Sequence, residues 1–129
     1  MPSVPPEPES LLPLTPVEFH ILLALADRDR HGYSIMQEIV VQTQGKLRIG
    51  PTTLYRSIKR LREHELIDEA DERPDPSLDD ERRRYYRLTS FGHRVAVAEA
   101  ERLSQTLALA RTKPGFASLS LSYGKEGAL

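Results

Sequence analysis

The stretch GPTTLYRSIKRLREHELI, residues 50–67, decides the fold prediction. It opens with a glycine and a proline, which suit the N-cap and the first position of a helix. Leu54, Ile58 and Leu61 then recur at the i, i+4, i+7 spacing of a buried helix face. Residues 46–64 hold six Lys or Arg residues and one acid, although the whole chain has a formal net charge of −1. The stretch therefore predicts a helix with one apolar and one cationic face.

Two further helices are predicted upstream of this stretch. The first begins at a capping box in which Thr15 is the cap, Pro16 is the first helical residue and Glu18 reaches back. It continues as EFHILLALADR, which is apolar around nearly its whole circumference and must be covered on two sides. One side is the domain core, and the other needs a helix from the same chain or from a second one. After HGY at 31–33, a helix with the sequence SIMQEIVVQTQ ends before Gly45.

A strand pair and a long helix are predicted downstream. Strands at 66–71 and 83–88 pair antiparallel across a loop that is too long for a tight hairpin. The segment 68–81 holds eight acids and one Arg. A long helix then spans 89–112 with Thr89 as its cap. It contains a coiled-coil-like seam of small and apolar residues, which are Ala96, Ala100, Leu103, Leu107 and Ala110.

This order of elements is typical of a winged helix-turn-helix. The predicted fold class is mainly α with a small two-stranded β-wing, followed by a long C-terminal dimerisation helix. The 129 residues suggest one domain, and six of the ten prolines lie within the first 16 residues. We therefore expect a disordered Pro-rich arm at 1–13, a winged helix-turn-helix domain at 14–88, a dimerisation helix at 89–112 and a flexible tail at 113–129.

Four segments of the sequence resemble the PadR family of bacterial transcriptional regulators. They are LTPVEFHILLALAD, HGYSIMQEI, GPTTLYRSIKRLREHELI and DERRRYYRLTSFGHRV, which together span about residues 14–112 in the family's order. The resemblance implies a homodimeric DNA-binding protein of the short C-terminal type, usually a repressor. It also implies that the C-terminal helix pairs the subunits and packs with the partner's first helix. Thr52 and Glu65 depart from the family, which often has glycine at both positions, and the wing loop is acidic.

Helical position and the resemblance together select the residues expected to contact DNA. Those near the start of the third helix are expected to meet base edges and phosphates, and the later cations are expected to hold the DNA backbone. Two arginines of the wing are added, although pairing with the neighbouring acids is an equal alternative for them. The alternative for the helix is an ordinary solvated face. The predicted set is Thr52, Thr53, Tyr55, Arg56, Lys59, Arg60, Arg82 and Arg83.

The doubly apolar first helix and the seam of the long helix predict a dimer interface. The first helix has more apolar surface than one core can cover, and the seam of the long helix is too short and Ala-rich to form a stable coiled coil by itself. Each can supply the apolar surface on which the other docks. The predicted interface residues are Phe19, Ile21, Leu22, Leu25, Ala96, Ala100, Leu103, Leu107 and Ala110.

The sequence carries no sign of catalysis or of a cofactor. It has no Cys, no HExxH spacing, no Gly-rich phosphate loop and no Ser/His/Asp arrangement. The N-terminus lacks the features of a signal peptide or a membrane span, so a cytoplasmic location is expected. Expected partners are double-stranded DNA with a near-palindromic operator, a second copy of the chain and an unidentified small-molecule effector. The alternative is a winged-helix protein-interaction module without DNA binding, in which the acidic segment 68–81 is the working surface.

Overall fold

The computed structural model describes residues 6–70 and 84–118, and the chain divides into two units, Met1–Glu99 and Ala100–Leu129. Within the described residues the helices are a 3-10 helix η1 and four α-helices: η1 Pro8–Leu11, α1 Pro16–Ala26, α2 Gly32–Gln42, α3 Pro51–Glu63 and α4 Ser90–Arg111. The strands are β1 Arg30–His31, β2 Ile67–Glu69 and β3 Tyr85–Leu88. The predicted mainly α fold with a small antiparallel sheet is confirmed.

The sheet has three strands in the order β1-β3-β2, one more than the predicted wing. β2 pairs with β3 in the register Ile67↔Leu88 and Asp68↔Arg87, as expected for the two arms of the wing. The extra strand is the two-residue β1, which pairs Arg30 with Tyr86 on the other side of β3. It joins the turn between α1 and α2 to the sheet, so the wing is attached to the helical core by hydrogen bonds as well as by packing.

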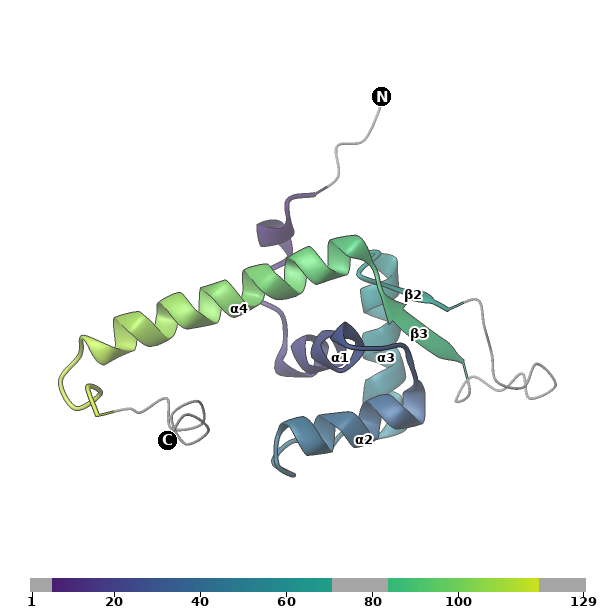
Figure 1. The fold of residues 1–129 in the computed structure, drawn as a ribbon, viewed down its shortest axis with the longest axis horizontal. Helices are drawn as coiled ribbons and strands as arrows, with labels where there is room; N and C mark the ends of the chain where they lie inside the picture. Colours follow the sequence, from purple (N-terminus) through teal and green to yellow (C-terminus); the bar gives the residue numbers. More distant parts are fainter. Residues whose placement is uncertain (1–5, 71–83, 119–129) are drawn as a thin grey trace. The chain divides into compact units, whose positions relative to one another are not determined.

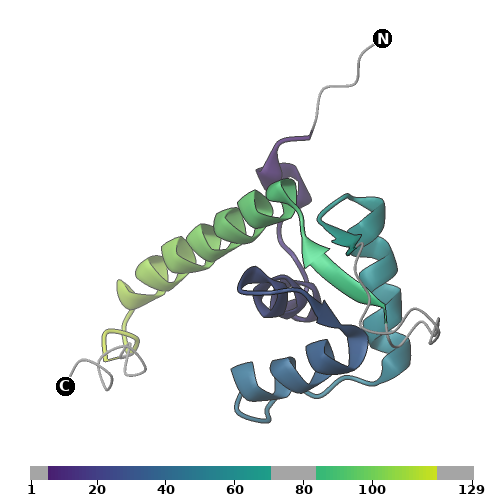
Figure 2. The same ribbon diagram turned by 45° about the vertical axis from the view of Figure 1, so that its right-hand side comes forward.

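Helix α1 lies at the centre of the first unit, with α2 and α3 around it (Figures 1 and 2). Its capping box is formed as predicted: the Glu18 backbone N–H donates to Thr15 Oγ1 at 3.1 Å, and the Thr15 N–H donates to Glu18 Oε1 at 2.9 Å. Ile21, Leu22 and Leu25 are buried in a core shared with α2, α3 and β3. Elements of the same chain therefore cover most of the apolar circumference that suggested a second partner.

The turn between α1 and α2 is held by Arg30, a buried cation that the sequence did not single out. Its Nε donates to the Ala24 carbonyl at 2.7 Å, and its Nη1 donates to Ser34 Oγ at 3.2 Å. Its Nη2 lies 3.6 Å from a carboxylate oxygen of Asp27 and 3.6 Å from one of Glu38. The guanidinium thus donates to a carbonyl in the last turn of α1, and the two carboxylates balance its buried charge.

The N-terminal segment differs from the expected disordered arm wherever it is described. η1 lies inside the range 1–13, and Leu11 and Leu12 pack against the core. The Leu14 N–H donates to Oε2 of Glu99 at 3.0 Å, and Glu99 is buried on α4. Apolar side chains and this hydrogen bond hold the segment, so its proline content does not prevent it from packing.

The C-terminus of α3 is closed by Glu65 in a left-handed conformation, with φ 61°. The Leu66 N–H donates to the Leu61 carbonyl at 2.9 Å, and the Glu65 N–H donates to the Arg62 carbonyl at 2.9 Å. These two bonds form a Schellman motif, which usually has glycine at the left-handed position. The Thr89 hydroxyl donates to the Glu65 carbonyl at 2.7 Å and so ties this turn to the start of α4.

Replacing Glu65 by glycine is expected to raise the free energy of unfolding by about 1 kcal/mol, because only glycine adopts this conformation without steric cost. Urea denaturation of the two proteins measures the difference. The matched control is Glu63→Gly on the same helix, where the backbone is helical and glycine should cost about 1 kcal/mol. A loss of stability in Glu65→Gly would mean that the side chain contributes more than its backbone strain costs.

Candidate nucleic-acid interface

Helix α3 separates its residues into two faces as the sequence predicted. Leu54, Ile58 and Leu61 are buried in the core. The polar residues of the opposite face are exposed: Thr52, Thr53, Arg56, Lys59, Arg60 and Glu63. Five of the eight residues predicted to contact DNA therefore lie together on one accessible side of one helix. Such a face combines hydroxyl donors near its N-terminus with cations further along, which suits base edges and phosphates.

The cations of this face differ in their partners. Among the residues that the structure describes, neither Arg56 nor Lys59 has a carboxylate within ion-pair distance. Arg60 does, because its Nε lies 3.2 Å from Oε2 of Glu18. The sequence predicted the contact of Glu18 with Thr15, because the two residues form a capping box. It did not predict the ion pair of Glu18 with Arg60, because these residues are 42 positions apart.

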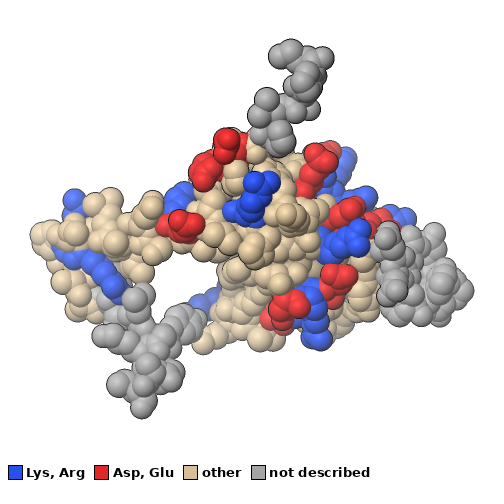
Figure 3. Space-filling view, turned by 45° about the horizontal axis from the view of Figure 1, so that its top comes forward, with Lys and Arg blue, Asp and Glu red and all other residues tan. Residues whose placement is uncertain are grey.

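Cations near the sheet are mostly paired. Glu69 lies between Arg62 of α3, at 3.8 Å, and Arg84, at 3.9 Å, and Arg87 lies 3.7 Å from Asp68. Figure 3 shows a face of the molecule on which basic and acidic side chains lie interleaved. These pairs are partly exposed and contribute little to stability one by one. They do reduce the positive potential beside the sheet, which leaves Arg56 and Lys59 as the cations of α3 with the least compensated charge.

Tyr55 is placed differently from the other predicted contacts. It is half-buried and packs on Gly32 at the start of α2, where an added Cβ would overlap the tyrosine hydroxyl and lie 2.9 Å from its Cζ. The glycine of the HGY segment leaves room for the Tyr55 ring, which would have to shift to admit a larger residue. This packing gives Tyr55 a role between two helices, and its contact with DNA stays a prediction.

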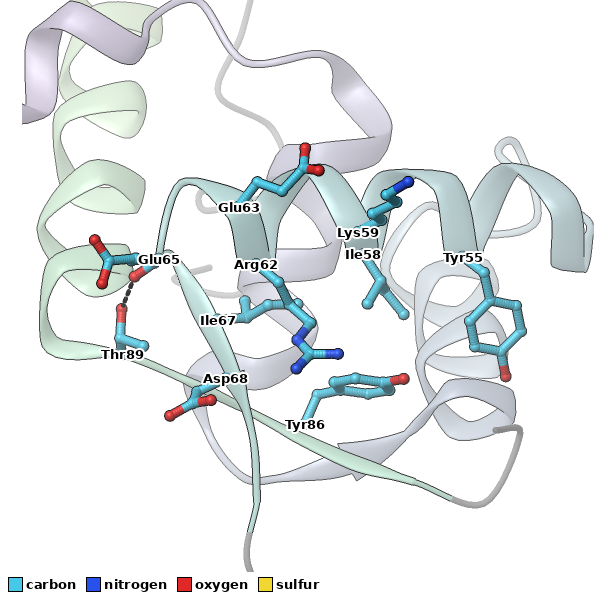
Figure 4. A pocket seen from close by; sticks show the side chains of 10 residues that line it. All are labelled: Tyr55, Ile58, Lys59, Arg62, Glu63, Glu65, Ile67, Asp68, Tyr86 and Thr89. Atoms are coloured by element: carbon cyan, nitrogen blue, oxygen red, sulfur yellow. Dashed lines mark hydrogen bonds between the residues drawn. The ribbon is translucent and has the colours of Figure 1, made fainter. Parts of the chain in front are cut away.

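A hollow of about 630 Å³ lies between α3 and the strands β2 and β3 (Figure 4). Ile58, Ile67 and Tyr86 form its apolar part, and Arg62 extends from α3 into it. Lys59 lies on its rim, so the hollow adjoins the cationic face. Its volume is in the range of small-molecule sites, about 300–1,000 Å³. No sequence signal indicated it, because its walls come from elements that only tertiary packing brings together.

The two wing arginines, Arg82 and Arg83, lie outside the described residues, as does most of the acidic segment 68–81. Their contact with DNA stays a prediction, and so does the alternative that they pair with nearby acids.

The residues predicted to form a dimer interface fall into two groups. Four of them are buried in the core of their own protomer, and their place in an interface stays a prediction: Ile21, Leu22, Leu25 and Ala96. Each of the four is at most 8% exposed, so little of its surface is open to a partner. Phe19 is half-buried and packs against the same core. In the second part of α4 the surface is more open: Ala100 and Leu103 are exposed, and Leu107 and Ala110 are half-buried.

Two further findings concern the described residues alone. They contain no helix that is long and apolar enough to span a membrane. The described part of the chain also has no cluster of three or more His, Asp or Glu residues arranged to hold a metal ion.

Both the sequence and the structure of this chain are similar to those of known transcriptional regulators. The model of the transcriptional regulator PadR-like family matches residues 21–98. An uncharacterised protein of Lysinibacillus sphaericus is 40% identical over 72 residues, which cover 56% of this chain and 63% of that protein, less than two thirds of its length. A transcriptional regulator from Clostridium thermocellum is similar in structure, with a TM-score of 0.64, 28% identity, and 76% of this chain and 89% of that chain covered.

A second solved structure shows the same fold at lower sequence identity. It is a PadR family transcription regulator from Clostridium difficile, with a TM-score of 0.61 and 21% identity, covering 74% of this chain and 95% of that chain. These likenesses confirm the winged-helix fold class and the resemblance seen in the four sequence segments.

Proposed function

Since this chain belongs to the PadR-like family of transcriptional regulators, we propose that it is a homodimeric repressor that binds operator DNA through α3. Members of the family are transcriptional regulators rather than enzymes. Binding to operator DNA would place the protein in the cytoplasm of a bacterial cell. An unidentified small-molecule effector would relieve the repression.

One observation carries the DNA-binding proposal: the exposed face of α3 gathers two threonines and three cations, opposite a fully buried apolar face. Thr52, Thr53 and Arg56 are proposed to meet base edges and phosphates. Lys59 and Arg60 are proposed to hold the DNA backbone, where each contact releases counterions and makes affinity depend on salt. Any surface helix separates apolar from polar residues, so the proposal depends on the excess of cations on the exposed face.

In a twofold-symmetric dimer, two α3 helices would enter successive major grooves, about 34 Å apart along the duplex. A near-palindromic operator follows from this symmetry. The wing arginines Arg82 and Arg83 are proposed to touch the flanking phosphates or minor groove.

The proposal is tested by titrating a labelled fragment of the gene's own promoter region with the purified protein and following fluorescence anisotropy. Random duplex of the same length is the competitor. We expect specific binding that weakens steeply between 50 and 200 mM salt, on the order of a thousandfold for six phosphate contacts. Weak, salt-insensitive binding to both duplexes would contradict the proposal and favour a protein-interaction module. In a reporter strain, deletion of the gene should raise expression from that promoter.

Dimerisation is proposed to use the exposed seam of α4. Replacing Leu103 and Leu107 together by glutamate is expected to convert a dimer to a monomer, because two buried charges per protomer would face their copies across the twofold axis. Light scattering after gel filtration measures the mass. Leu109→Glu is the matched control, since Leu109 is 58% exposed but lies on another side of α4, and it should leave the dimer intact. A wild-type monomer, or a dimer that survives the double substitution, would contradict this interface.

A further inference from the structure

Glu18 is a buried residue that makes three polar contacts, two of them through its carboxylate. Its Oε1 accepts the Thr15 N–H at 2.9 Å, and its backbone N–H donates to Thr15 Oγ1 at 3.1 Å. Its Oε2 lies 3.2 Å from Nε of Arg60. The Glu18 side chain is 8% exposed, whereas the Arg60 side chain is 66% exposed. The pair therefore joins a fixed anion in α1 to a cation on the proposed DNA-binding face of α3.

The carboxylate is held in place on its other side as well. The capping box fixes the Glu18 side chain to the first turn of α1, so its position is set by backbone and not by a mobile loop. The residue just before this cap, Leu14, donates its N–H to the buried Glu99 of α4 at 3.0 Å. Glu18 is thus anchored at the point where the N-terminal segment, α1 and α4 meet, and its Oε2 is presented to α3 from a rigid support.

We infer that Glu18 is a positioning residue that holds the Arg60 guanidinium ready for a DNA phosphate. The inference rests on the proposed function, because it assumes that α3 binds DNA. The shortest contact to Glu18 runs through Nε, the inner nitrogen, and the exposed end of the side chain carries the two terminal nitrogens. Those nitrogens donate in the fork geometry that suits a phosphate. An arginine that is already ordered loses less rotamer freedom when the phosphate arrives.

A different role for the same pair makes the opposite prediction. If Glu18 merely neutralised Arg60, removing its charge would strengthen DNA binding. If Glu18 positions Arg60, removing the ion pair weakens DNA binding. Glu18→Gln separates the two roles, because glutamine has nearly the same volume and also serves as the third residue of a capping box. The substitution therefore removes the ion pair and leaves the cap.

The experiment measures the affinity of four proteins for the promoter fragment at one salt concentration: wild type, Glu18→Gln, Arg60→Gln and the double variant. We expect Arg60→Gln to lose about tenfold in affinity and to lower the salt slope by about one. Glu18→Gln should lose about threefold. The double variant should match Arg60→Gln alone, because Glu18 acts only through Arg60.

Two measurements separate positioning from a purely structural role. Thr15→Ala removes the hydroxyl of the capping box but keeps the backbone N–H that holds Glu18 Oε1, so the ion pair stays in place. It should lower the melting temperature by a few degrees and leave DNA affinity within about twofold. In the free protein, the Nε–H signal of Arg60 in an NMR relaxation experiment should report an ordered side chain in wild type and a mobile one in Glu18→Gln.

Each outcome decides the inference. Three results would overturn the inference while the proposed function stands. The first is DNA binding by Glu18→Gln that is tighter than or equal to that of wild type. The others are an equal loss of affinity from Glu18→Gln with and without Arg60, and an Arg60 Nε that is mobile in wild type. A wild-type protein that binds no promoter DNA would overturn the proposed function, and the inference would fall with it.

Discussion

Replacing Arg56 and Lys59 together by alanine is expected to weaken binding to the promoter fragment by about a hundredfold. The two side chains are exposed on α3 and, within the described residues, pair with no acid, so DNA would be their main partner. A base-edge contact contributes about 1–3 kcal/mol, and a lost phosphate contact adds to this. Loss of the Lys59 contact should also lower the slope of log affinity against log salt by about one. Anisotropy titration over a range of salt concentrations measures both effects.

The control must remove the same charge elsewhere. Arg28 and Arg94 are exposed, and neither lies on α3. Their double replacement by alanine changes the net charge by the same amount and is expected to alter affinity less than about threefold, because long-range fields are screened beyond about 10 Å. If both double variants lose affinity equally, DNA binding depends on net charge alone, and α3 has no special role in it.

The second large effect is on stability: Gly92→Ala is expected to lower the free energy of unfolding by about 3 kcal/mol. Alanine in place of a helical glycine usually stabilises by about 1 kcal/mol. Here the added Cβ would overlap the carbonyl oxygen of Leu66 and would lie 2.9 Å from Cδ1 of Leu88. The Leu66 carbonyl also accepts the Thr89 N–H at 3.1 Å and the Thr89 hydroxyl at 3.0 Å. Because backbone is what obstructs the Cβ, relief requires α4 to move away from the end of α3.

Denaturation with urea measures this loss, which is a large part of the about 5–15 kcal/mol that stabilises a typical domain. Gly50→Ala is the matched control, since no atom lies within 4 Å of a Cβ built there and its φ of −88° suits any residue. It should cost less than about 1 kcal/mol, from the weaker N-cap preference of alanine. Equal stability of Gly92→Ala and wild type would show that the start of α4 is not packed tightly against Leu66.

Much of the candidate site was predictable because it lies on one helix. The spacing of Leu54, Ile58 and Leu61 shows which side of α3 faces the core. Helical geometry then places its threonines and cations on the exposed side. The capping box of α1 was predictable for the same reason, since its two partners are three residues apart. The residues 82 and 83 of the wing lie outside the described ranges, and their role remains a prediction.

The dimer interface stays a prediction, and the reason is physical. An apolar helix circumference shows only that a helix is surrounded, and it does not show which chain surrounds it. In the structure, α2, α3 and β3 of the same chain bury Ile21, Leu22 and Leu25. Burial by neighbours distant in sequence leaves no periodic signal, so our dimer proposal uses the exposed part of α4.

By itself, the sequence determined the local features of this protein: helix starts and stops, the two faces of α3 and the family to which the chain is similar. These depend on residues a few positions apart, whose contacts are set by backbone geometry. Tertiary structure alone decided the rest: the pairing of β1 with β3, the burial of Arg30 and Glu99, the fit of Tyr55 against Gly32 and the ion pair of Glu18 with Arg60. Each of these joins residues whose closeness depends on how whole elements pack, and a linear pattern does not encode that packing.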